Sequence, residues 1–95
     1  SLSTFEPLDC PELMHGMGDS LCVSRMQLVM NELGCASLAL GFELQGSGNF
    51  GDNTMATVIF FQERFGLASN GVFGPDSQAA ANQAAAAGVI DCLPK

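Results

Sequence analysis

The sequence predicts an all-α fold: a compact three-helix bundle with pseudo-repeated turn-helix units, an irregular N-terminal arm and two disulfides. Two segments carry apolar residues at helical spacing, and a third consists largely of alanine, the strongest helix former. The chain has 95 residues, which suffices for one hydrophobic core and is too short for two. Its four cysteines are expected to form disulfides, because no pair has the C-x-x-C spacing of zinc ribbons or redox motifs.

The beginning of the chain differs from the rest because it lacks any sustained apolar periodicity. It contains two prolines and two glycines that interrupt regular structure, namely Pro7, Pro11, Gly16 and Gly18. We therefore expect an irregular arm over residues 1–19, tied down through Cys10, and a helical domain over residues 20–95.

The first predicted helix spans residues 20–33. Its apolar stripe follows the helical spacing i, i+4, i+7, i+8 and i+11, and consists of Cys22, Met26, Val29, Met30 and Leu33. Gly34 can end this helix in the left-handed conformation. Residues 35–50, which contain glycine and serine, are predicted to form an irregular connection.

The second predicted helix spans residues 52–65 and ends at Gly66. One face of it is apolar and consists of Met55, Val58, Ile59, Phe61 and Phe65. The third begins at Pro75, since proline is tolerated at the first helical position. Its alanine-rich segment, residues 79–87, extends to Gly88.

An internal repeat appears when the chain is laid over itself at an offset of 23 residues. Leu44, Gly48, Phe50, Gly51, Thr54 and Ala56 align with Leu67, Gly71, Phe73, Gly74, Ser77 and Ala79. Each copy is a turn followed by the start of a helix, in which the first glycine permits a positive φ and the phenylalanine packs inward. Asp52 and Asp76 suit the positive end of a helix dipole.

These residues resemble the bacterial peptidoglycan-binding domain that is found beside cell wall hydrolases. The resemblance is carried by Gly51, Thr54, Val58, Phe61, Gln62, Gly66 and Leu67, and then by Asn70, Gly71, Val72, Phe73, Gly74, Pro75 and Ser77. Upstream, Met26, Gln27, Leu33 and Gly34 are similar to the leading helix of the family. The resemblance covers about residues 23–86 and implies a three-helix module that holds an exported enzyme near peptidoglycan without catalysing a reaction itself.

The chain departs from the family pattern at a few positions. Ser47 and Asn70 replace the two turn aspartates, Thr57 replaces an alanine and Met26 replaces a leucine. Asn70 retains the side-chain to backbone bonds that an aspartate makes in such a turn, and Ser47 makes them more weakly. The connection over residues 35–44 is also longer than the family predicts.

Polar residues of the two turns are the candidate ligand-binding groups for a glycan strand or stem peptide. They are Gln45, Asn49, Asp52, Asn53, Gln62, Asn70 and Asp76, and they are expected to border one shallow groove. Gln62 has two open interpretations: its amide either bonds the preceding loop backbone or faces a ligand. Phe50, Phe61, Phe65 and Phe73 are expected to be core residues.

Composition excludes several other functions. Ten acidic residues against three basic ones give a charge of -7, the wrong sign for nucleic acid or anionic membrane partners. A single histidine and no cluster of acidic ligands argue against a metal or another cofactor. His15 has no nucleophile motif beside it, so we expect no catalytic residue and no enzyme activity.

The alternative function is a protein-protein interaction or inhibitory module that keeps this fold without binding glycan. Related domains resemble the pro-segments of matrix metalloproteases, but the cysteine-switch motif PRCGxPD is absent here. Loss of both turn aspartates and the acidic charge favour this alternative. The leading hypothesis remains a wall-associated, secreted module with peptidoglycan as its partner and a fused or associated wall hydrolase as a further candidate partner.

Disulfide connectivity is narrowed by geometry. Cys22 and Cys35 would lie at opposite ends of the first helix, roughly 20 Å apart and beyond disulfide reach. Of the two remaining patterns we prefer Cys10 with Cys22 and Cys35 with Cys92, which clip the arm and the C-terminal tail to the two ends of that helix. The first residues do not form a signal peptide, so an export signal is expected to have been removed or to lie outside these residues.

Overall fold

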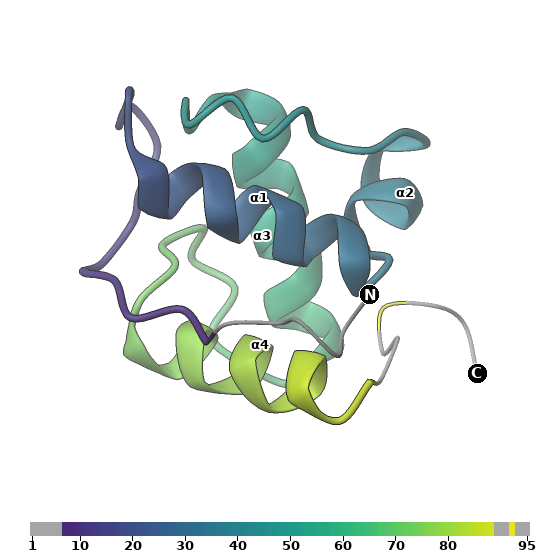
Figure 1. Cartoon of the computed structure of the whole chain (residues 1–95). Helices are drawn as coiled ribbons and strands as arrows, with labels where there is room; N and C mark the ends of the chain where they lie inside the picture. The colour runs from purple at the N-terminus through teal and green to yellow at the C-terminus, as the bar shows by residue number, and fades with distance from the viewer. Residues whose placement is uncertain (1–6, 89–91, 93–95) are drawn as a thin grey trace.

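The structure is a computed structural model that describes residues 7–88 and Cys92. These residues contain four helices and no named strand: α1 (Leu21–Glu32), α2 (Cys35–Leu40), α3 (Asp52–Arg64) and α4 (Pro75–Ala86). The predicted all-α class is therefore confirmed. In Figure 1, α1 crosses in front of α3, and α4 lies below both.

Helix α2 corrects the prediction of an irregular connection over residues 35–50. Gly34 ends α1 with a φ of 84° and is at the same time the N-cap of α2, which ends at Gly41 with a φ of 84°. Six residues are too few to form a stable helix alone. This helix is stabilised by packing, because Cys35 and Ala36 are fully buried.

The three longer helices match their predicted positions, apart from one residue at one or both ends. Helix α1 is capped by the Ser20 side chain, which accepts a hydrogen bond from Val23 N at 3.2 Å. Helices α3 and α4 begin in the same way: their N-caps Gly51 and Gly74 have φ and ψ values of -97° and -164°, and of -98° and -163°. The predicted repeat is thus present in the backbone geometry.

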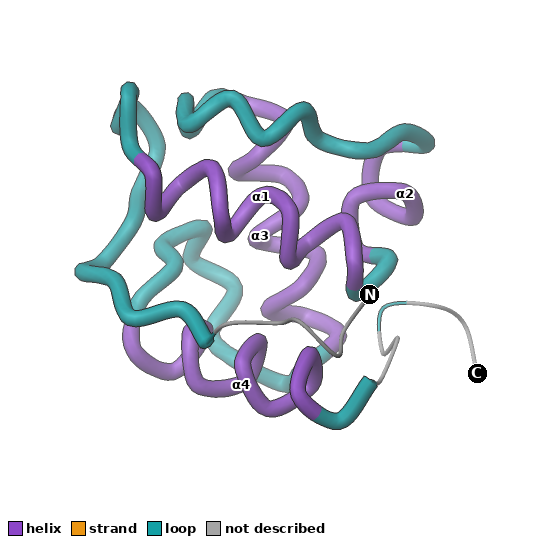
Figure 2. The backbone as a smooth tube through the Cα atoms, in the orientation of Figure 1, coloured by secondary structure: helices purple, strands orange, loops and turns teal. Residues whose placement is uncertain are grey.

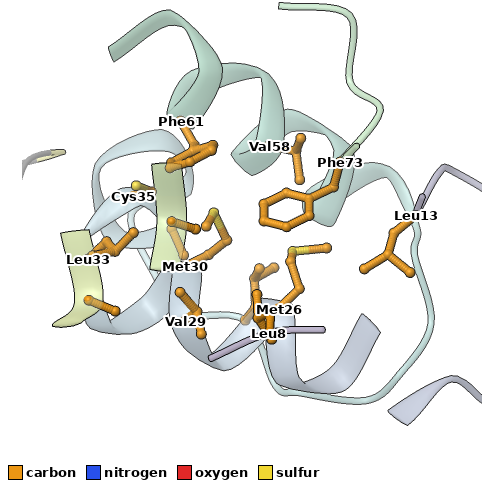
Figure 3. Close-up of a cluster of buried hydrophobic side chains, with 14 of the residues drawn as sticks. Leu8, Leu13, Met26, Val29, Met30, Leu33, Cys35, Val58, Phe61 and Phe73 are labelled. Atoms are coloured by element: carbon orange, nitrogen blue, oxygen red, sulfur yellow. The ribbon is translucent and has the colours of Figure 1, made fainter. Parts of the chain in front are cut away.

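The core lies between α1, α3 and α4 and includes Met26, Met30, Val58, Phe61 and Phe73 (Figure 3). Phe50 is also buried, as expected. Phe65 is only partly buried and packs against Phe61, with ring centroids 4.5 Å apart. Helix α4 contributes small side chains to the core, Ala81, Ala84 and Ala85.

The described part of the arm runs along the turns that precede α3 and α4 (Figure 2). Leu13 exchanges two backbone hydrogen bonds with Phe73, at 3.0 and 2.8 Å. Gly16 N donates to Phe50 O, and Phe50 N donates to Met17 O. Leu8 and Leu13 are buried, so the arm contributes to the core as well as to the turns.

Both predicted disulfides are present. Cys10–Cys22 joins the arm to the start of α1, with a Cα–Cα distance of 5.9 Å. Cys35–Cys92 joins the start of α2 to the residues that follow α4, with a Cα–Cα distance of 4.9 Å. The preferred connectivity is therefore confirmed over the pattern that pairs Cys10 with Cys35.

Candidate functional site

The second turn is held by the side-chain amide of Gln62 in α3. Gln62 Nε2 donates to Val72 O at 2.8 Å, to Ser77 Oγ at 3.1 Å and to Asn70 Oδ1 at 3.2 Å. Gly71 N donates to Gln62 Oε1 at 3.0 Å. The interpretation that Gln62 bonds the preceding loop was wrong, because its partners lie in the following turn. Its amide is engaged and the residue is 1% exposed, so its contribution is to shape the turn.

The first turn is held in the same way by Gln27 in α1. Gln27 Nε2 donates to Asn49 O at 3.0 Å and to Thr54 Oγ1 at 2.9 Å, while Gly48 N donates to Gln27 Oε1 at 3.0 Å. These partners align, at the offset of 23 residues, with the partners of Gln62. We call this arrangement the glutamine clamp. Sequence reasoning missed it at Gln27. The signal that the two clamps share is a glutamine directly after a core residue, Gln27 after Met26 and Gln62 after Phe61.

Each turn borders its own pocket, which corrects the expectation of one shared groove. The first groove has a volume of about 560 Å³ and is lined by four of the predicted ligand-binding residues, Gln45, Asn49, Asp52 and Asn53. The second has a volume of about 270 Å³ and is lined by the other three, Gln62, Asn70 and Asp76. The linings of the two grooves correspond at most positions at the offset of 23 residues.

The arm makes different contacts with the two grooves. Glu12 lines the second groove, where its Oε2 would lie 3.2 Å from a methyl group added to Gly74. At the first groove, His15 Nε2 lies 2.8 Å from Asp52 Oδ1, and Asp19 N donates to Asn49 Oδ1 at 3.3 Å, in addition to the backbone bonds of the arm with Phe50. The first groove is the larger of the two, and no described residue of the arm is among its lining residues.

Two of the predicted ligand-binding residues in the first groove have side-chain amides without a hydrogen-bond partner among the described residues. Within the described part of the chain, the side-chain amides of Gln45 and Asn53 form no hydrogen bond, and both residues are exposed. The second groove has fewer amide groups available to a ligand, because Asn70 Oδ1 already accepts a hydrogen bond from Val72 N at 2.9 Å. Asp76 is exposed in the first turn of α4.

Sequence reasoning missed two further residues of the first groove, Phe42 and Glu43. Phe42 is 54% exposed. The sequence signal for them is the connection over residues 35–44, which is longer than the family predicts. Glu43 and Asp52 make the groove acidic, and none of its lining residues is Lys or Arg.

Other kinds of site were searched for in the same residues. No group of three or more His, Cys, Asp or Glu side chains in the described ranges is placed to hold a metal ion. Among the helices described, none has the length and apolar character to cross a membrane.

The comparison with protein families gives a match that includes both turns and both clamps. The model of the peptidoglycan binding domain family matches residues 23–80, more than half of the chain. The chain therefore belongs to this family, which is a family of binding domains. Comparisons with curated proteins and with solved structures give no match.

Proposed function

We propose that this domain is a non-catalytic module of a secreted bacterial protein, that it binds peptidoglycan, and that its binding site is the first groove. Membership of the peptidoglycan binding domain family supports peptidoglycan as the ligand. The observation that carries the location is that Gln45 and Asn53 line the larger groove with side-chain amides that no described residue engages. Such groups are available to a ligand without breaking a hydrogen bond of the fold.

The second groove is the less suitable site. It has about half the volume, the arm places Glu12 in it, and its Asn70 and Gln62 side chains hold the turn. A ligand that used these amides would compete with bonds that the fold needs. Asp76, which the sequence analysis named as a candidate contact, therefore serves as a control under this proposal.

The test is retention of the oxidised domain on insoluble peptidoglycan sacculi, with the double variant Gln45→Ala/Asn53→Ala compared with Asp76→Ala. Asp76 aligns with Asn53 in the repeat, so the control removes a matched residue from the second groove. We expect the double variant to lose about tenfold or more in affinity, since each hydrogen bond contributes about 1 kcal/mol. Asp76→Ala should bind like the parent domain.

Circular dichroism spectra and unfolding curves establish that all variants fold. Loss of binding in Asp76→Ala alone would move the site to the second groove. Failure of the parent domain to bind any sacculi would contradict the proposed function and favour the protein-interaction alternative.

A further inference from the structure

We infer that the first groove takes the sugar chain of peptidoglycan, an uncharged run of N-acetylated hexosamines, rather than its charged stem peptides. This inference rests on the proposed function and specifies the ligand class of the same groove. Three observations carry it: an exposed aromatic ring on a segment with anchored backbone, two amides that no described residue engages, and an acidic lining.

The aromatic ring belongs to a segment that is fixed on both sides. Gly41 N donates to Ser37 O at 2.8 Å and ends α2 before Phe42. After Phe42, Leu44 is pinned to α1, because its N and O atoms each form a 2.8 Å hydrogen bond with the side chain of Asn31. The ring of Phe42 is thus presented at the groove by anchored backbone while 54% of the residue remains exposed.

An exposed ring at the edge of a polar groove suits a sugar. The apolar face of a hexose can cover the ring, while its hydroxyl and acetamido groups reach the polar lining. A ligand that covers Phe42 removes the apolar surface of the ring from water, which favours binding. In the empty groove the ring stays in contact with water.

The amides of Gln45 and Asn53 complement the acetamido group. A primary amide offers both donors and an acceptor, and an acetamido group presents one N–H and one C=O. Both side chains line the same groove as Phe42. The groove therefore combines an apolar platform with groups that can both donate to and accept from an N-acetylated sugar.

The charge of the groove disfavours the stem peptide. Glu43 and Asp52 are acidic, and no lysine or arginine lines the groove to neutralise a ligand carboxylate. Stem peptides carry carboxylates, which two nearby negative charges would repel. The sugar chain carries no free carboxylate where the lactyl carboxyl of its muramic acid is amide-linked to a stem peptide. The second groove has no aromatic residue in its lining, so the same ligand is not expected there.

The experiment is an NMR titration of the whole oxidised domain with two soluble probes. One probe is the β-1,4-linked tetramer of N-acetylglucosamine, and the other is a synthetic stem tetrapeptide with free carboxylates. Sacculi binding is measured in parallel on the same preparation. We expect the tetramer to shift the amide signals of residues 42–54, and the tetrapeptide to leave them unchanged.

The variant Phe42→Ala should weaken tetramer binding by about tenfold or more. Its matched control is Leu21→Ala, which removes another exposed apolar side chain, 75% exposed and outside the groove. Tetramer binding by Leu21→Ala should equal that of the parent.

Two sets of outcomes separate this inference from the proposed function. Sacculi binding without tetramer binding, with or without binding of the tetrapeptide, would overturn the sugar assignment and leave the proposed function intact. Absence of sacculi binding would remove the proposed function and this inference together. Equal tetramer affinity in Phe42→Ala and Leu21→Ala would overturn the role of the ring.

Discussion

Buried glutamine is the residue on which each turn of this domain depends. Gln27 and Gln62 are 2% and 1% exposed, and they reach from α1 and α3 to the turns that precede α3 and α4. A primary amide is suited to this position because it donates and accepts at once without carrying a charge. A glutamate of the same shape would accept only and would bury a negative charge.

Removal of the second clamp should destabilise the domain. For Gln62→Ala we expect the free energy of unfolding to fall by about 2–4 kcal/mol, because Gly71 N and Val72 O lose a partner inside the protein. Urea unfolding followed by circular dichroism measures the loss. The control Gln45→Ala, at an exposed amide, should stay within about 0.5 kcal/mol of the parent. Equal stability of the two variants would contradict the clamp.

Gly48 is constrained by its surroundings as well as by its backbone. It has a φ of 84°, and a Cβ added there would lie 2.9 Å from Ser20 O. Gly41 has the same φ of 84° but no atom within 4 Å of an added Cβ. A comparison of alanine substitutions at Gly48 and Gly41 therefore separates the cost of a positive φ from the cost of a steric contact with Ser20, the N-cap of α1.

We expect Gly48→Ala to lower the free energy of unfolding by about 1–3 kcal/mol more than Gly41→Ala does. The reason is that backbone atoms of Ser20 cannot move aside as the end of a flexible side chain can. Thermal and urea unfolding of both variants measure the difference. A similar loss in both would show that the turn can shift away from α1.

At the scale of elements, α4 depends on hydrogen bonds from the arm as well as on core packing. Its buried residues are small, so burial along the helix stabilises it less than a leucine-rich face would. The arm compensates: Leu8 exchanges two hydrogen bonds with Asn82, at 2.8 and 2.9 Å, and Cys10 N donates to Gln78 at 2.9 Å. Cys92 fixes the chain beyond α4 to the start of α2.

The two disulfides should differ in how much they stabilise the domain against unfolding. Cys10–Cys22 spans 12 residues and Cys35–Cys92 spans 57. The chain-entropy relation gives stabilisations of about 3 and about 4 kcal/mol for loops of these sizes. We expect Cys35→Ser/Cys92→Ser to lose more stability than Cys10→Ser/Cys22→Ser in urea unfolding. The reverse order would show that the arm contributes more through its contacts than loop closure alone predicts.

At the scale of the whole molecule, the charge of -7 opposes approach to a negatively charged wall. Many sacculi carry anionic polymer, and salt screens repulsion between exposed charges over a distance of about 10 Å at 0.1 M. We expect retention on polymer-bearing sacculi to rise as salt is raised, and retention on stripped sacculi to stay constant. Sedimentation assays at several salt concentrations measure both. Retention that falls with salt would indicate an attractive ionic contact and would contradict a neutral sugar ligand.

The sequence by itself determined the features that depend on local pattern. The stripe of α1, the proline at the start of α4 and the repeat at an offset of 23 residues predicted the three main helices, since helical spacing and turn glycines act within a few residues. The length of α1 excluded the pairing of Cys22 with Cys35, because a rigid helix separates them, and left two patterns open. The structure shows the preferred one.

Only the tertiary structure decided how the candidate site is assembled. Helix α2 forms because packing buries Cys35 and Ala36. Its six residues are too few for a helical pattern in the sequence to predict it. The Gln27 clamp joins residues 21 to 27 positions apart, a distance that no local pattern encodes. The division of the polar turn residues between two grooves, and the exposure of Phe42 at one of them, depend on where the arm and the connection pack.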